Sequence, residues 1–209
     1  MSDALHRTDA AVAAAYDARA AEYVEVAGSI DQMDAADRAL IAQWRDATSG
    51  ALLDAGCGPG PWADFLHDGH RDVRGLDLSG HFVATARERH PHLRFDQGSF
   101  RDLPYEDSSL RGVLAWYSLI HTPPADIPEI LMEFARVLAS DGSLLIGYFD
   151  GPPRRVFSHA VAPAYFWSAE ALRDPLAEAG FTITHRERRE RVSGEVSIRP
   201  HGSLSARQA

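Results

Sequence analysis

The stretch that most constrains the fold is Leu52-Leu53-Asp54-Ala55-Gly56-Cys57-Gly58-Pro59-Gly60, where an apolar run ends at an acidic residue and breaks into three alternating glycines. Glycine accepts a positive φ and lets a ligand approach the main chain closely. Pro61 follows and suits the first position of a helix, where an N–H group is not needed. The stretch therefore predicts a buried strand, a tight turn and a helix N-terminus, an arrangement typical of the ligand edge of a parallel sheet.

Strand and helix patterns alternate through the rest of the chain. We expect strands over 51–55, 73–78, 94–97, 112–117, 143–149, 181–186 and 202–207, and helices over 8–27, 34–47, 61–68, 80–90, 125–138 and 168–179. Units this short predict an α/β fold, a doubly wound Rossmann-like sheet of seven strands that is mostly parallel, with helices on both faces. The last two strands have no room for a helix between them, so they are expected to form an antiparallel hairpin at the C-terminus.

The ends of the expected helices carry recognisable signals. Thr8 is a candidate N-cap and Gly28 a candidate stop for the first helix. Ser140-Asp141-Gly142 is expected to end the helix over 125–138, and Ser168 is a candidate N-cap for the last one. No internal repeat or low-complexity tract interrupts the series.

Length and composition suggest one domain in an intracellular protein. The chain has 209 residues, 45% of them hydrophobic, which predicts a single domain over 1–209 with a helical cap over 1–48 and a Rossmann-like core over 49–209. The net charge of −9 argues against a broad nucleic-acid surface. One cysteine, no signal-peptide pattern and no apolar run of about 18 residues favour a cytoplasmic location without membrane partners. An oligomer remains possible.

The glycine pattern can be compared with two nucleotide-binding motifs. A P-loop needs Gly-Lys-Ser/Thr at its end, but Gly60-Pro61-Trp62 offers no lysine. A dinucleotide fingerprint needs a glycine at its sixth position, which Pro61 occupies. Asp54 also precedes the first glycine, so the pattern Asp-x-Gly-x-Gly-x-Gly differs from both motifs.

The chain resembles the class I S-adenosylmethionine-dependent methyltransferases, small-molecule type. The resemblance starts at 53–60 and extends to about Phe181. It is carried further by Gly75-Leu76-Asp77-Leu78-Ser79, by Asp102-Leu103-Pro104-Tyr105, by Trp116-Tyr117-Ser118-Leu119-Ile120-His121, and by the segment from Tyr165 to Phe181. It implies S-adenosyl-L-methionine as cofactor, S-adenosyl-L-homocysteine as product and a small-molecule methyl acceptor.

The same resemblance implies roles for individual residues. Asp77 would accept from both ribose hydroxyls, Leu78 would pack on the adenine, and the glycine turn would hold the methionine part. Gly98, Ser99 and Phe100 would flank the adenine edge, Ala115 and Trp116 would lie under the sulfonium, and Tyr16 and Tyr23 would close over the site. The full cofactor-binding set that we expect is Tyr16, Tyr23, Asp54, Gly56, Cys57, Gly58, Gly60, Trp62, Asp77, Leu78, Gly98, Ser99, Phe100, Ala115 and Trp116.

The sequence departs from the family pattern at two positions. Ser99 stands where the family often has an acidic residue for the adenine amino group. Leu110-Arg111 stands where the family often has Phe-Asp before its fourth strand. The first departure changes a ligand contact, whereas the second concerns strand geometry.

His121 is the candidate catalytic residue. It follows the fourth strand, where the transferable methyl group should point, and histidine titrates near neutral pH. A base is needed only when the acceptor holds its proton tightly, and His121 could instead cap or pack the following segment. Tyr117, His121 and His159 are the candidate substrate-binding residues, although aromatic residues here could equally belong to the core.

Other chemistry-bearing residues favour simpler interpretations. His90 and His92 lack a partner at metal spacing, so no metal site is expected. Arg154-Arg155 could hold an acceptor carboxylate or lie in a solvated loop. The arginines between 186 and 191 alternate with glutamates, as on a solvated strand edge. Cys57 sits within the turn and is not expected to act as a nucleophile.

Three other functions remain open on the sequence. A non-catalytic protein that binds S-adenosylmethionine, as a regulator or partner, would keep the same motif. Methylation of RNA or protein would need a basic patch, and no uninterrupted one is present. A dinucleotide oxidoreductase is disfavoured by Pro61.

Overall fold

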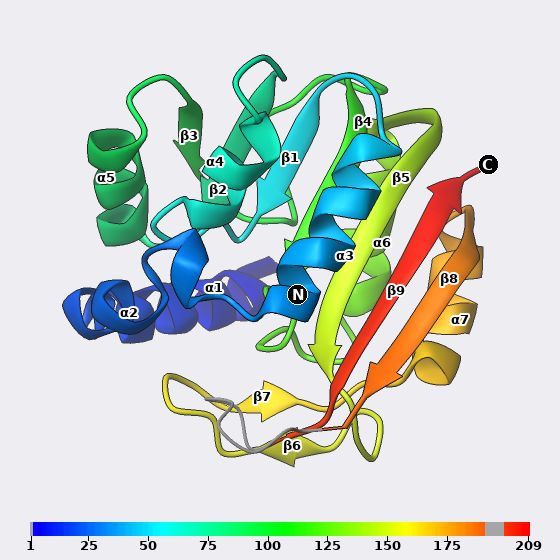
Figure 1. The fold of residues 1–209 in the computed structure, drawn as a ribbon. Coiled ribbons are helices and arrows are strands. Elements are labelled where there is room, and N and C mark those ends of the chain that lie inside the picture. Colours follow the sequence, from blue (N-terminus) through cyan, green and yellow to red (C-terminus); the bar gives the residue numbers. More distant parts are fainter. Residues whose placement is uncertain (1, 191–198) are drawn as a thin grey trace.

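The computed structural model describes residues 2–190 and 199–209 and contains a seven-stranded sheet in the order β3-β2-β1-β4-β5-β9-β8 (Figure 1). The strands are β1 Leu52–Ala55, β2 Val73–Asp77, β3 Arg94–Gln97, β4 Leu110–Trp116, β5 Leu138–Phe149, β8 Phe181–Arg189 and β9 His201–Gln208. β1 to β5 pair in parallel, and β9 pairs antiparallel with both β5 and β8. The expected doubly wound α/β sheet and its C-terminal hairpin are both confirmed.

Helices cover both faces of the sheet. They are α1 Ser2–Asp17, α2 Ala20–Ala27, α3 Ala35–Asp46, α4 Pro61–His67, α5 Gly80–Arg89, α6 Ile127–Val137 and α7 Ala169–Glu178, with a short 3-10 helix, η1 Ile30–Gln32. α3, α4 and α5 pack on one face, and α6 and α7 pack on the other. α1 runs across the end of the sheet towards which β5 points (Figure 1). No helix among the described residues is long and apolar enough to cross a membrane.

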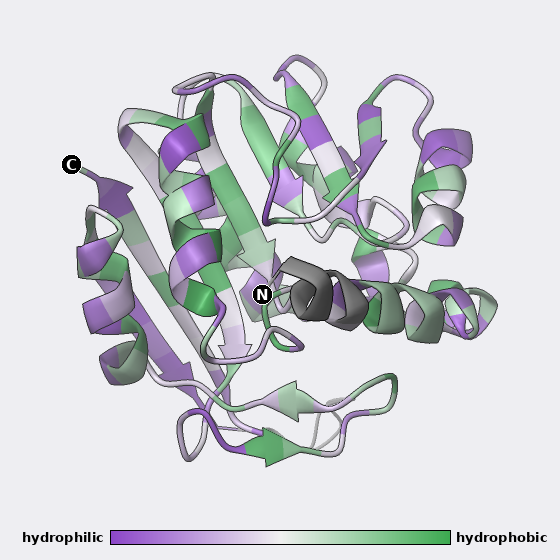
Figure 2. Ribbon diagram, turned by 180° about the vertical axis from the view of Figure 1, so that it is seen from behind, coloured by the Kyte–Doolittle hydropathy of each residue, from purple (hydrophilic) through white to green (hydrophobic). Residues whose placement is uncertain are grey.

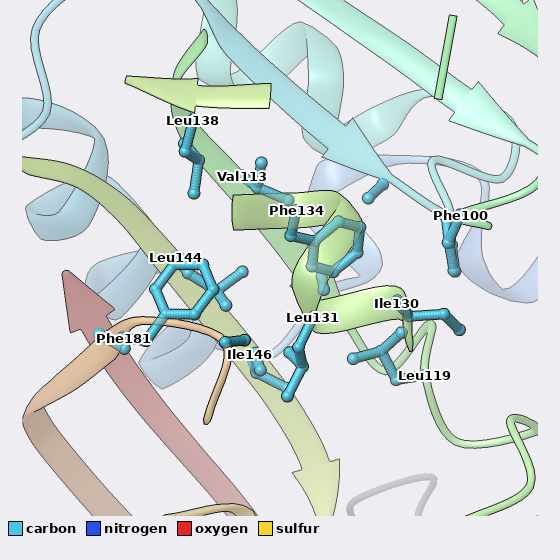
Figure 3. Packing of buried hydrophobic residues seen from close by; sticks show 14 of the residues in the cluster. Phe100, Val113, Leu119, Ile130, Leu131, Phe134, Leu138, Leu144, Ile146 and Phe181 are labelled. Atoms are coloured by element: carbon cyan, nitrogen blue, oxygen red, sulfur yellow. The ribbon is translucent and has the colours of Figure 1, made fainter. Parts of the chain in front are cut away.

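The larger core lies between the sheet and α6. Phe134 and Leu131 of α6 are fully buried against Val113 of β4 and Leu144 of β5 (Figure 3). In Figure 2 the central strands are mostly hydrophobic, whereas the edge strand β8 is mainly hydrophilic. The central strands are therefore held by burial on both faces, as the continuous apolar sequence of a parallel sheet requires.

The prediction of one helix over 8–27 with Thr8 as its N-cap is wrong. The helix begins at Ser2, and a break at Ala18 and Arg19 separates α1 from α2. Arg19 leaves helical geometry at φ −122° and ψ 13°, while its guanidinium contacts Glu22 and the carbonyl of Ala160. The alanine-rich sequence carries no local break signal, because the contact at Ala160 comes from a segment distant in the chain.

Gly28 is confirmed as the residue that ends α2, and Ser168 is confirmed as the N-cap of α7, where its hydroxyl accepts from the Ala171 N–H. The helix expected over 125–138 spans only 127–137, and the segment 140–142, expected to end it, lies within β5. Leu138 leaves the helix to pair with Leu110 of β4, so pairing between strands fixes the boundary.

One small sheet has no counterpart in the sequence predictions. β6 Val156–Phe157 and β7 Ala164–Tyr165 form an antiparallel pair in the loop after β5. Phe157 packs on Phe166 at 4.3 Å between ring centroids, and the Arg199 guanidinium lies 4.2 Å from the Phe157 ring. Two-residue strands are too short to leave a periodic pattern in the sequence. We call residues 156–165 the flap.

Candidate functional site

The glycine turn connects β1 to α4 at the carboxyl end of the central strands. Gly56, Gly58 and Gly60 all have positive φ, at +81°, +54° and +91°. A Cβ on Gly56 would lie 2.3 Å from Cβ of Ser118, and Gly60 is the left-handed N-cap that precedes Pro61. Gly56 and Gly60 are therefore required by both backbone conformation and space.

The turn is tied to the end of β2 through Asp77. The Gly58 N–H donates to Oδ2 of Asp77 at 2.9 Å, and the Ser79 N–H donates to Oδ1 at 2.8 Å. These bonds orient Asp77, and the Leu78 N–H also favours its ionised form. A carboxylate has about four acceptor positions, so capacity for a further donor remains. The vicinal hydroxyls of a ribose are donors of that kind.

Two carboxylates lie together here, and among the described residues no cationic side chain is bonded to either. Asp54 is 1% exposed; burial raises its pKa to about 8, and the charge of Asp77 adds to the effect. Burial also raises the pKa of Asp77 to about 6, against the opposing effect of its backbone donors at Ser79 and Gly58. Such an arrangement favours a ligand that carries positive charge of its own.

Two buried oxygens beside the turn have no partner within the described residues. They are Oδ2 of Asp54 and Oγ of Ser118, the residue whose side chain faces Gly56. Buried polar atoms are usually hydrogen-bonded, so unpartnered ones mark a place where a polar ligand is accommodated. Together with the acceptor positions still open on Asp77, these oxygens fit a nucleoside that bears a cationic amino-acid chain.

The side chains of several expected cofactor residues are buried below the turn. Cys57 is 3% exposed and its thiol faces Gly75, whereas Trp62 is 7% exposed and meets the Trp116 ring at 6.5 Å between centroids. Ala115 is fully buried in β4. These residues shape the floor beneath the turn.

The residues after β3 continue this edge. Gly98 donates its N–H to the Asp77 carbonyl at 3.0 Å, and Leu78 is half-buried. Phe100 is 7% exposed, and its ring packs on Phe134 of α6. Ser99 is half-buried and bonds Asp9 of α1, a residue that sequence reasoning missed.

Aromatic rings from α1 and α2 lie over the glycine turn. Tyr16 and Tyr23 meet edge to face at 5.9 Å, and both contact Phe82 of α5, at 5.6 and 5.1 Å. Tyr23 also approaches Gly58. Burial raises the pKa of Tyr16 far above its usual value and that of Tyr23 to about 12, so both phenols stay protonated.

His121 is buried at the far end of this aromatic group. Its Nδ1 lies 2.9 Å from the Pro163 carbonyl of the flap, and its Nε2 lies 3.0 Å from the Tyr16 hydroxyl. A carbonyl can only accept, so Nδ1 carries the proton and Nε2 accepts from Tyr16. Burial lowers the pKa of His121. The residue is therefore a neutral base with its lone pair facing the edge of the site.

The three candidate substrate-binding residues are brought together by the fold. The His121 and His159 rings lie 5.1 Å apart, and Phe149 connects His159 to Tyr117 with centroid distances of 6.0 and 5.0 Å. Burial, followed by the neighbouring His121, lowers the pKa of His159 to about 4. The wall beyond His121 is thus aromatic, with two neutral histidines, and Arg19 and Arg199 lie near enough to His159 to lower its pKa further.

Tyr117 has an unusual conformation within this wall. Its φ of +53° is rare for a bulky residue, and its hydroxyl bonds Nδ1 of His201 at the start of β9. Non-glycine residues are held in this region only where the surroundings impose it, which occurs often at functional sites.

Sequence reasoning missed five residues of this region. They are Asp9, Asp17, Phe149, Pro163 and His201, of which Asp17 bonds the Ser79 hydroxyl. Asp9 and Asp17 are acidic residues in an alanine-rich helix, a pattern that could have indicated a functional role. Phe149, Pro163 and His201 lie near strand ends or in the flap, where no sequence pattern marks them.

We find no cluster of metal-binding side chains in the part of the chain that the structure describes. No group of three or more His, Cys, Asp or Glu side chains there could hold a metal ion.

Comparison with known proteins agrees with this geometry. Residues 52–142 match the family model described as a methyltransferase domain. A probable S-adenosylmethionine-dependent methyltransferase of Mycolicibacterium smegmatis is 35% identical over 107 residues, which are 51% of this chain and 40% of that protein. The chain therefore spans about two fifths of the length of this curated relative.

Two solved structures extend the likeness in fold to nearly the whole chain. Magnesium protoporphyrin IX methyltransferase from Synechocystis, crystallised with S-adenosylmethionine, has a TM-score of 0.73 at 18% identity and 97% coverage of both chains. A [4+2]-cyclase has a TM-score of 0.77 at 21% identity, with 94% of this chain and 95% of that chain covered. At these identities the likeness establishes the architecture.

Proposed function

We propose that this chain is a class I S-adenosylmethionine-dependent methyltransferase, which transfers a methyl group from S-adenosylmethionine to a small-molecule acceptor and releases S-adenosylhomocysteine. The observation that carries the proposal is the glycine turn flanked by Asp54 and Asp77, two carboxylates with raised pKa values and no bonded cation among the described residues. S-adenosylmethionine supplies both a ribose and two positive charges.

The cofactor would lie along the carboxyl ends of β1 and β2. Asp77 would accept from the ribose hydroxyls with the acceptor positions that Gly58 and Ser79 leave open. Asp54 and Ser118 have oxygens without a partner in the described part of the chain, close to the methionine side of the turn. Tyr16 and Tyr23, from the helical cap over residues 1–48, would exclude water from above.

The cofactor, when bound, supplies an activated methyl group on a sulfonium, so this chain has mainly to position the acceptor and exclude water. His121 would remove the acceptor's proton at Nε2. The Pro163 carbonyl holds the proton on Nδ1 and so fixes the tautomer that this role needs. Tyr16 bonds the same Nε2, so a bound acceptor would take the place of its hydroxyl.

The acceptor side favours a small molecule. Its described wall consists of aromatic rings and of histidines whose pKa values are lowered. The arginines of β8 are engaged with acidic residues: Arg186 with Glu170, Arg188 with Asp150 and Arg189 with Asp37. This pairing disfavours RNA methylation, because a phosphate backbone needs available cations.

A second candidate is a protein of this fold that binds the cofactor without transferring its methyl group. The specific observation in its favour is the fold likeness to a [4+2]-cyclase, a protein whose name denotes another reaction. The bond between Tyr16 and His121 fits either candidate, because it occupies the base until a ligand enters.

Calorimetry with S-adenosylhomocysteine tests cofactor binding, and methyl-labelled S-adenosylmethionine with a panel of phenols, carboxylic acids, amines and thiols tests transfer. We expect binding and label transfer to one class of acceptor. Absence of binding contradicts both candidates. Binding without transfer to any member of the panel favours the second.

A further inference from the structure

We propose that Asp9 of α1 is the residue that selects adenine, by accepting a hydrogen bond from its exocyclic amino group. The inference rests on the proposed function, since it concerns the nucleoside of the same cofactor. It assigns base recognition to a residue of α1, which is distant in the sequence from the end of β3, where the base would lie.

The strand order places the base. With the ribose at Asp77, the methionine chain runs towards the glycine turn and β4, on one side of β2. The base must then extend to the other side, where β3 pairs with β2 through Gln97 opposite Asp77. The first side chain after Gly98 that carries a polar group is Ser99.

Ser99 is the weaker acceptor at this place. Its Oγ accepts from the Arg101 N–H at 3.2 Å and donates to Oδ2 of Asp9, which leaves one lone pair of a neutral hydroxyl. The stronger, charged acceptor is the carboxylate of Asp9. Within the described residues, both contacts of Asp9 use Oδ2, and Oδ1 has no bonded donor.

Arg101 holds Asp9 in this position. Its side chain is 7% exposed, with Nε 3.4 Å from Oδ2 of Asp9 and the two Nη groups on Asp126 and Glu129. The Asp9 side chain is 19% exposed, so its carboxylate is not sealed in the core. Arg101 is held by its bonds to Asp126 and Glu129 and lies beside Asp9 as an ion pair, while the hydrogen bond from Ser99 orients the Asp9 carboxylate.

The arrangement links base recognition to the packing of α1. Asp9, Tyr16 and Asp17 lie on one side of this helix and contact Ser99, His121 and Ser79 in turn. A base with an amino group would add a bond to Asp9, whereas a carbonyl at the same position would face a carboxylate and be repelled.

The test compares S-adenosylhomocysteine with S-inosylhomocysteine, which has a carbonyl in place of the amino group, by calorimetry. The wild-type chain is expected to prefer the adenine compound, and Asp9→Asn to reduce the ratio of the two affinities by roughly tenfold or more, because a bond to a charged acceptor is lost and an amide can also donate.

Asp17→Asn is the matched control. It removes the same charge from the same helix and weakens the contact with Ser79, but it is expected to change both affinities by the same factor. An unchanged ratio in Asp9→Asn, with native circular dichroism, overturns the proposal. Failure of the wild-type chain to bind either compound instead contradicts the proposed function.

Discussion

The cofactor side and the acceptor side of the candidate site are built on different principles. Apart from Ser118 and the covering tyrosines, the cofactor side uses residues between Asp54 and Phe100, which are close in sequence and include two carboxylates with raised pKa values. The acceptor side gathers Tyr16, His121, His159 and His201 from distant segments. Burial keeps Tyr16 protonated and lowers the pKa of both His121 and His159. The first side is suited to a cationic ligand of fixed shape, and the second presents an aromatic wall.

The largest effect is expected on the acceptor side. His121→Ala should lower turnover by roughly 10²–10⁴-fold, the usual contribution of a general base. The dissociation constant of S-adenosylhomocysteine should change little, because the hydrogen bonds of His121 within the described residues go to Tyr16 and Pro163. Steady-state kinetics and calorimetry measure the two quantities.

Tyr16→Phe is the control for this variant. It removes only the hydroxyl that bonds Nε2 and leaves the base in place. A loss of turnover as large as that of His121→Ala would show that Tyr16 itself acts in catalysis. The helical cap would then be part of the catalytic machinery. Unchanged turnover in His121→Ala would reduce His121 to a structural residue.

Asp77→Ala is expected to weaken cofactor binding more than it lowers turnover, the opposite of His121→Ala. It removes two charge-assisted hydrogen bonds to ribose, each worth roughly 1.5–3 kcal/mol, so binding of S-adenosylhomocysteine should weaken by about two orders of magnitude or more. Turnover at saturating cofactor should fall much less than in His121→Ala. Unchanged affinity, measured by calorimetry, would remove Asp77 from the site.

The raised pKa values predict that cofactor binding depends on pH. In the free protein Asp54, with a pKa of about 8, is mostly protonated at pH 7. A bound cation favours its ionised form, so binding should release protons and become tighter as pH rises from about 6 to 8. Calorimetry in buffers of different ionisation enthalpy measures the release, and proton uptake would contradict the charge assignment.

The smallest effect is expected in stability. The folded pKa of Asp54 lies above its unfolded value, so the folded state binds more protons and its free energy of unfolding falls as pH rises from about 4 to 8. Asp54→Asn should therefore stabilise the free protein at pH 8, by about 1 kcal/mol or more. Urea unfolding measures it. Asp46→Asn is a suitable control, because the Asp46 side chain is 62% exposed.

The sequence predicted the cofactor side well because its constraints are local. Gly56, Gly60 and Pro61 are required by the backbone of one turn, and Asp77 ends the adjoining strand. The prediction failed where distant segments meet. Arg19 breaks the first helix by contacting Ala160, and Leu138 leaves α6 because it pairs with Leu110.

The sequence by itself determined the doubly wound sheet, the ligand edge and the positions of Asp54 and Asp77, since each follows from alternation along the chain or from the conformational needs of glycine and proline. The tertiary structure alone decided that Asp9 contacts Ser99, that Tyr16 bonds Nε2 of His121 and that the Pro163 carbonyl selects its tautomer. These contacts depend on how α1 and the flap pack across the end of the sheet, and no local pattern in the sequence encodes that packing.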